Sequence, residues 1–170
     1  DVSVIDDEHE HNHHINFNDF IAKIDSLKSE GIPNLTDEMV ELAKSVFMRI
    51  AISEANVHGK SLEDIHFHEV GAADAVADVF GTIYCYFDLG MCDERVVGLP
   101  IAVGGGTVET AHGIIPVPAP ATLDILKDGA KYFGGPVNTE LATPTGVALY
   151  MELCDEFLEF SPMMSPEAIA

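Results

Sequence analysis

The stretch "TDEMVELAKSVFMRIAISEANVHG" (residues 36–59) carries the strongest fold signal of the chain, because it reads as a long amphipathic helix. Thr36 can cap its first turn, where Asp37 and Glu38 favour the positive end of the helix dipole. Gly59 can end the helix in a left-handed conformation. The predicted apolar face consists of Met39, Leu42, Ala43, Val46, Phe47 and Ile50.

Further helices and short extended segments are predicted on both sides of this helix. Asn16 can cap a first helix, and Thr143 with Pro144 can open a last one that includes "TPTGVALYMELCDEF". The other predicted helices are residues 72–89 and "APATLDILKDG" (119–129), and the extended segments are 65–70, 94–106, 108–118 and 130–135. No regular alternation of strand and helix is visible. The pattern predicts an α+β fold, with irregular α/β as the alternative, of about five helices with a small mixed sheet.

The chain divides into three parts. Residues 1–14 are acidic, rich in histidine and without helical or strand periodicity, so we expect a mobile tail or linker. Residues 15–160 are expected to form a single α+β domain, and residues 161–170 a second tail. The first residue is not Met, which suggests a fragment of a longer protein.

The composition limits the classes of partner. The net charge is −21, with only 8 Lys and Arg residues in 170, which argues against a nucleic acid or an anionic membrane as partner. No apolar run is long enough to cross a bilayer. The three cysteines Cys85, Cys92 and Cys154 show no CxxC spacing, which favours a reducing, cytoplasmic location. A homo-oligomer stays open.

Metal-capable side chains concentrate in "HFHEVGAADAVAD" (residues 66–78). In an extended segment, His66 and His68 point to the same face. Asp74 and Asp78 are four positions apart and share a helix face with Gly81 and Cys85, which suggests that something packs closely there. An ordinary structural histidine, and carboxylates that only complement a helix dipole, are the alternatives for His66 and for Glu69 with Asp74.

A second histidine cluster lies in the tail. Imidazoles interspersed with carboxylates bind nickel, zinc or copper. A plain linker or an expression tag is the alternative, although the interruptions by Glu and Asn argue against a tag. The four histidines are His9, His11, His13 and His14.

Two further motifs follow, "GGGTVETAHGIIPVPAPATLDIL" and "TELATPTG". The glycines fit neither a P-loop nor a dinucleotide-binding pattern, but Gly105 and Gly106 allow backbone to approach a ligand closely. His112 lies in a segment made rigid by prolines, where a structural role is the alternative. Thr143 and Thr145 flank a proline at a helix start that could meet an anion, or they could simply cap the helix.

Taken in this order, "VHGKSLEDIHFHEVGAADAVADVFG", "GGGTVETAHGIIPVPAPATLDIL" and "TELATPTGVAL" resemble the LarC family of nickel-insertion proteins. The likeness covers about residues 9–150. It implies insertion of nickel into pyridinium-3,5-bisthiocarboxylic acid mononucleotide, which gives the nickel-pincer cofactor of lactate racemase and related enzymes. It also implies a requirement for CTP with a divalent metal, bound in a C-terminal domain that we expect to be missing here, as is the N-terminal "SGISGD"-like segment.

The resemblance suggests roles for the motifs. The tail histidines could collect nickel, and His66 and His68, with Glu69 or His112, could hold or pass on the ion. Asp74 or Asp78 could be a further ligand or the base that removes a pyridinium proton. Three alternatives stay open: a nickel or zinc storage module without catalysis, a metal-assisted hydrolase, and a structural scaffold.

Overall fold

The computed structural model describes residues 15–67, 73–110 and 113–165. Within these ranges it contains five α-helices and four β-ladders of two strands each, which confirms the predicted α+β class. The helices are α1 (Phe17–Ser26), α2 (Asp37–His58), α3 (Ala73–Asp88), α4 (Pro120–Leu126) and α5 (Pro144–Leu153), with short 3-10 turns η1 (Leu27–Ser29), η2 (Leu62–Asp64) and η3 (Met91–Asp93).

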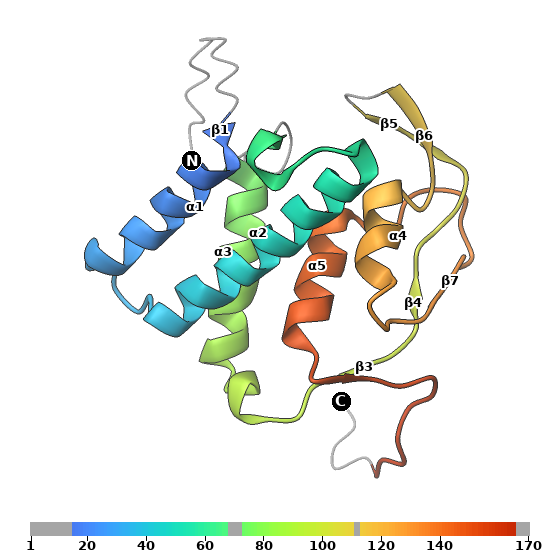
Figure 1. Cartoon of the computed structure of the whole chain (residues 1–170). Helices are drawn as coiled ribbons and strands as arrows, with labels where there is room; N and C mark the ends of the chain where they lie inside the picture. The colour runs from blue at the N-terminus through green and yellow to red at the C-terminus, as the bar shows by residue number, and fades with distance from the viewer. Residues whose placement is uncertain (1–14, 68–72, 111–112, 166–170) are drawn as a thin grey trace, which may run out of the picture.

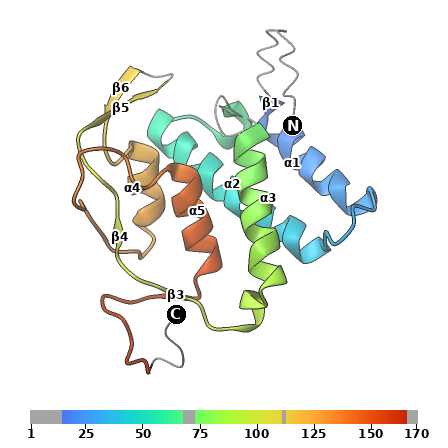
Figure 2. The ribbon, with the colours of Figure 1, turned by 180° about the vertical axis from the view of Figure 1, so that it is seen from behind.

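The long helix α2 is the centre of the fold. It packs against α1 and α3 on one side and against α4 and α5 on the other (Figures 1 and 2). All residues of the predicted apolar face are buried except Leu42, which is half-buried. Four residues outside that face are buried as well, because helices cover α2 on two sides: Val40, Ala51, Ser53 and Ala55.

The start of α1 and both ends of α2 lie where the sequence predicts them. The Asn16 side chain accepts a hydrogen bond from Asn18 N at 2.8 Å, and Thr36 accepts one from Met39 N at 3.2 Å. Gly59 takes a left-handed conformation with φ of 62° and ends α2. These caps satisfy backbone groups that a helix end leaves without partners.

The last helix is shorter than predicted. α5 ends at Leu153, and residues 156–157 form strand β8 (Glu156–Phe157), which pairs in parallel with β3 (Val97–Gly98). Asp155 N donates to Val96 O at 2.9 Å, and the Asp155 carboxylate accepts from Val96 N at 2.8 Å. These long-range bonds draw the chain away from the helical path that local sequence favours.

The strands form separate ladders of both kinds in place of one mixed sheet. β4 (Ile101–Ala102) pairs in parallel with β7 (Tyr132–Phe133), and β5 (Thr107–Thr110) pairs antiparallel with β6 (Gly113–Pro116). β1 (Ile15–Asn16) pairs antiparallel with β2 (His66–Phe67). The stretch from β3 to β4 therefore pairs with β8 in its first half and with β7 in its second half.

The glycine run after β4 has a structural function. Gly104 has φ of 88°, and a Cβ added there would lie 1.8 Å from Thr139 O. Gly105 N donates to Thr139 O at 3.2 Å, and Leu141 N donates to Val103 O at 3.2 Å. The absence of a side chain at Gly104 therefore allows residues 139–141 to lie directly on this loop.

Gly104→Ala is expected to lower the free energy of unfolding by about 2–4 kcal/mol, because it combines backbone strain with a clash against a carbonyl. The matched control is Gly81→Ala, where an added Cβ meets nothing within 4 Å and the helical φ is ordinary. That control should gain about 0.5–1 kcal/mol from helix propensity. Urea unfolding of both variants measures the difference, and equal stabilities would contradict the assigned function of Gly104.

Candidate functional site

The β1·β2 ladder ties the start of α1 to the segment that precedes α3. Ile15 pairs with Phe67, and Asn16 pairs with His66. Phe17 N donates to Ile65 O at 3.4 Å, and the Asn16 side chain donates to Glu63 O at 3.1 Å. Ile15 directly follows the histidine-rich segment. The ladder therefore places this residue opposite Phe67 of the "HFHE" motif.

Several predicted site residues lie outside the described ranges. They are Glu69, His112, His68, His9, His11, His13 and His14. In the sequence, His14 directly precedes Ile15 and His68 directly follows Phe67, so each is the immediate sequence neighbour of a ladder residue. Their functional assignment stays a prediction.

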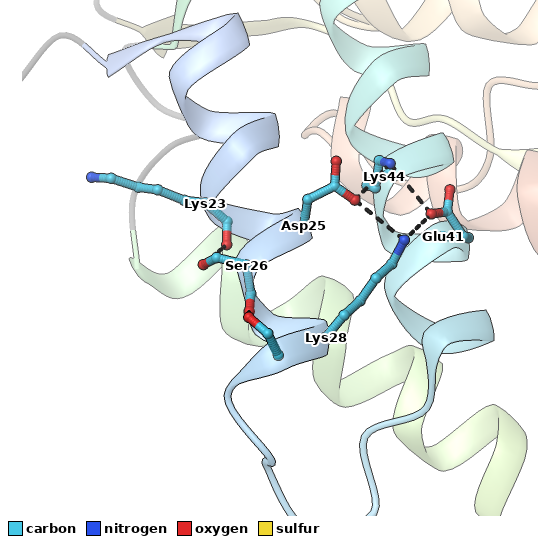
Figure 3. Close-up of polar contacts among 7 residues, drawn as sticks. Lys23, Asp25, Ser26, Lys28, Glu41 and Lys44 are labelled. Carbon is cyan, nitrogen blue, oxygen red and sulfur yellow. Dashed lines mark hydrogen bonds and ion pairs between the residues drawn. The ribbon is translucent and has the colours of Figure 1, made fainter.

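An ion-pair network holds α1 and η1 on α2 (Figure 3). Lys44 Nζ lies 2.8 Å from Asp25 and 3.3 Å from Glu41. Lys28 Nζ lies 3.3 Å from Asp25 and also binds Glu41. Behind this network, Phe20 packs edge-on against Phe47 with ring centroids 4.8 Å apart. Because β1 leads directly into α1, these contacts also fix the ladder to β2.

The network perturbs its carboxyl groups. The hydrogen bond from Lys44 lowers the pKa of Asp25 below its ordinary value, and the bond from Lys28 does the same for the pKa of Glu41. A lowered pKa in the folded state means that the ionised carboxylate stabilises the fold above the unfolded-state pKa. This contribution is lost as the pH falls through the folded-state pKa.

The carboxylates of α3 form an exposed face. Asp74 and Asp78 are both exposed, as are Gly81 and Cys85 on the same face. Asp74 Oδ1 accepts a hydrogen bond from Ala75 N at 2.9 Å in the first helical turn. A Cβ at Gly81 would meet nothing within 4 Å. The close packing expected on this face is therefore not provided by the described part of the chain.

The structure brings the glycine loop and the beginning of the "TELATPTG" motif together. The Asn138 side chain lies against Gly105 and Gly106. Three residues further along the chain, Leu141 N donates to Val103 O. Thr143 Oγ1 accepts from Gly146 N at 3.3 Å and so caps α5, as one of the two interpretations of this motif expects. Thr145 is half-buried in the first turn.

The β1·β2 ladder and the beginnings of two helices lie at one end of the helical layer (Figures 1 and 2). α3 and α5 both begin on the side of the molecule where β1 lies, and both run away from it (Figures 1 and 2). Two helix N-termini at one end favour negative charge there. Among the described residues no group of three or more His, Cys, Asp or Glu side chains is arranged to hold a metal ion. A metal site at this end would need ligands from the remaining motif residues.

Comparison with known proteins identifies the family. The profile of the nickel insertion protein family matches residues 1–170, so the chain belongs to this family. A relative from Methanothermobacter thermautotrophicus is 55% identical over 141 residues, which are 82% of this chain and 34% of that protein. A relative from Methanosphaera stadtmanae is 46% identical over 155 residues, which are 90% of this chain and 38% of that protein.

The name of a third relative states the compound into which nickel is inserted. The pyridinium-3,5-bisthiocarboxylic acid mononucleotide nickel insertion protein of Desulfitobacterium hafniense is 45% identical over 126 residues, 74% of this chain and 31% of that protein. The chain thus spans about a third of the length of the curated relatives that it matches. No solved structure matches it significantly. No helix in the described ranges is long and apolar enough to cross a membrane.

Lys44→Met is expected to raise the pKa of Asp25, because the largest cause of its depression is removed while Lys28 remains nearby. The variant should also lose less stability than the wild type as the pH falls from neutrality to below the ordinary carboxyl pKa of about 4. NMR titration of the Asp25 carboxyl carbon measures the first effect, and thermal unfolding across that range measures the second. Lys23→Met, on α1 but outside the network, is the control and should leave both unchanged.

Proposed function

We propose that the protein of which this chain is part inserts nickel into pyridinium-3,5-bisthiocarboxylic acid mononucleotide. Membership of the nickel insertion family over residues 1–170 is the observation that carries this proposal. The printed names of relatives from Desulfitobacterium hafniense and Acetivibrio thermocellus supply the substrate. Nickel is here the cargo of the reaction, and the protein has to bind the ion and then release it to the organic substrate.

The β1·β2 ladder supports a common function for the two histidine clusters. Nickel(II) accepts imidazole and carboxylate ligands. The histidine-rich segment ends one residue before Ile15, and Ile15 pairs with Phe67 between His66 and His68 in the sequence. In this proposal the segment gathers nickel, His66 and His68 receive it, and Glu69 or His112 completes the ligand set.

The acidic face of α3 supports the second half of the proposal. Asp74 lies in the first turn of α3, a few residues after the "HFHE" motif, and Asp78 lies one turn further on the same exposed face. One of them serves as a further ligand or as the base that takes the pyridinium proton when the carbon–nickel bond forms. Gly105, Gly106, Thr143 and Thr145 are proposed to contact the anionic groups of the substrate.

Several finer features are part of the same proposal. The reaction depends on CTP and a divalent metal bound outside this chain, it takes place in the cytoplasm, and its product serves lactate racemase-type enzymes. The whole protein is proposed to catalyse this step as a lyase. The acidic surface of the chain supports the expectation that neither nucleic acid nor membrane is a partner.

The experiment that tests the nickel site is the double substitution His66→Gln and His68→Gln in the full-length protein. Loss of two direct ligands should weaken nickel binding by at least about 100-fold, since loss of an outer partner alone costs about 10–100-fold. Isothermal titration with nickel chloride measures the affinity, and cofactor assembly is measured in parallel. His58→Gln is the matched control, because His58 lies on α2 beside Glu54 and is not one of the proposed ligands. Unchanged affinity and assembly in the double variant would refute the site.

Asp74→Asn and Asp78→Asn separate the two possible functions of these carboxylates. If one is the base, its replacement should lower the rate of cofactor assembly by about 100-fold or more while nickel affinity stays the same. If it is a ligand, both quantities should fall. Asp88→Asn, in the last turn of the same helix and also exposed, is the control. A normal rate in both Asp74 and Asp78 variants would remove the acidic face from the mechanism.

A further inference from the structure

The β4·β7 ladder turns one face toward the helices and the other face away from them. Ile101 pairs with Tyr132, and Ala102 pairs with Phe133. Because side chains alternate along a strand, Ile101 and Val103 share one face and Ala102 lies on the other. Ile101 packs against the hydrophobic core and Val103 is fully buried, so theirs is the inner face. Ala102 and its partner Phe133 therefore lie on the outer face.

The outer face is apolar and only half-covered. Phe133 is 52% exposed, and Leu141 is 47% exposed. The Leu141 N–H donates to Val103 O at 3.2 Å, which holds this residue beside the ladder. A Cβ added at Gly135 would lie 3.0 Å from Ala102 Cβ and 3.3 Å from Leu141 Cδ1. The side chains of Ala102, Phe133 and Leu141 thus lie together on this face, and we call them the outer patch.

Parallel strands are almost always covered on both faces, because the connections between them place helices there. α4 lies beside the β4·β7 ladder on its inner side (Figures 1 and 2). On the outer side, the described residues leave half of the Phe133 side chain in contact with water. A ladder of two strands also needs further elements packed on it to be stable. The outer patch is therefore a surface where the packing expected of parallel strands is incomplete.

Most of a typical family member lies outside this chain. The relatives from Methanosphaera stadtmanae and Methanothermobacter thermautotrophicus align with it over 38% and 34% of their own length. The rest of such a protein is joined to this chain covalently, so its segments are present at a high effective concentration beside the outer patch. A cover for the patch is thus available within one polypeptide.

A second copy of this chain fits the patch less well. Each copy carries a net charge of −21, and two such surfaces repel each other when they approach. The patch itself consists of three apolar side chains and offers no opposite charge to offset this repulsion. A covalently linked segment is held close to the patch in spite of the net charge.

We propose that an apolar segment of the same polypeptide, from outside residues 1–170, covers the outer patch and buries the β4·β7 ladder on both faces. The inference uses only the packing of this chain and its length relative to its family, so it does not depend on the proposed function. Its position is of interest because β4 leads into the glycine loop, where Gly105 N donates to Thr139 O at 3.2 Å. The covering segment would therefore support this loop from outside.

Hydroxyl-radical labelling of the full-length protein, read by mass spectrometry, tests the cover directly. The oxidation rate of each side chain in the native protein is compared with its rate in urea. Phe133 should be slowed by at least about tenfold, as should the core residue Phe47, because both rings are then removed from water. A slowing of Phe133 well below that of Phe47 would mean that its ring stays half-exposed, and it would overturn the proposal.

A charge placed on the patch provides the second test. In the full-length protein, Phe133→Glu should lower the midpoint of thermal unfolding by about 3 °C or more, because the carboxylate loses its hydration under the cover. Ile32→Glu is the matched control, since Ile32 is 41% exposed in the turn between η1 and α2. It should change the midpoint by less than about 1 °C. An unchanged midpoint in Phe133→Glu, or an equal fall in the control, would contradict the proposal.

Light scattering distinguishes a cover within one polypeptide from a second copy. The full-length wild type and Phe133→Glu should have the same molar mass in solution, because the covering segment belongs to the same chain. A wild-type oligomer that Phe133→Glu converts into monomers would place a second copy on the outer patch and would overturn the proposal. The labelling experiment needs no substitution, so it remains decisive even if Phe133→Glu does not fold.

Discussion

The burial of α2 on two sides is the constraint on which the rest of the described structure depends. Phe47 and Ile50 are fully buried in its middle, and each such side chain contributes about 1.5–3 kcal/mol when removed from water. α1 and α3 cover one side, and α4 and α5 cover the other. Because α1 lies on α2, β1 reaches β2. Because α4 and α5 lie on the opposite side, Arg49 of α2 reaches Asp128 and Glu152.

The same constraint separates two regions with different chemistry. The end where α3 and α5 begin has the ladder next to the "HFHE" motif, the exposed carboxylates of α3 and the cap of α5. The surface between α2, α4 and α5 has Arg49 held by carboxylates from other parts of the chain. The first region contains the motifs for which a nickel site is proposed, and the second contains ion pairs that join α2 to α4 and α5.

Local sequence was sufficient for features that depend on neighbouring residues. The caps at Asn16 and Thr36 and the stop at Gly59 all rest on bonds within a few positions, so the sequence predicts them correctly. It could not predict the end of α5, because the bonds of Asp155 go to Val96, 59 positions away. The second buried side of α2 was missed for the same reason, since Ser53 donates to Ala121 O, which is 68 residues distant.

Motifs of the candidate site were recognised from their residue types, but their arrangement was not. The sequence did not predict the pairing of Ile15 with Phe67, nor the contact of Asn138 with the glycine loop. The sequence does not predict the contacts of Arg49 with Asp128 and Glu152, because these residues are spread over 103 positions and form no motif. The one signal available was the scarcity of basic residues, of which three line the cavity beside these contacts.

In the proposed function, the β1·β2 ladder and the start of α3 surround the nickel site. Nickel(II) in an imidazole and carboxylate environment is commonly paramagnetic, so it broadens the NMR signals of nearby nuclei. Addition of less than one equivalent to the ¹⁵N-labelled chain should broaden the amides of Ile15, Asn16, Phe67 and Asp74 first, while those of β8 at the other end stay sharp. Broadening that begins at β8 or around Arg49, with sharp signals along the ladder, would contradict the account.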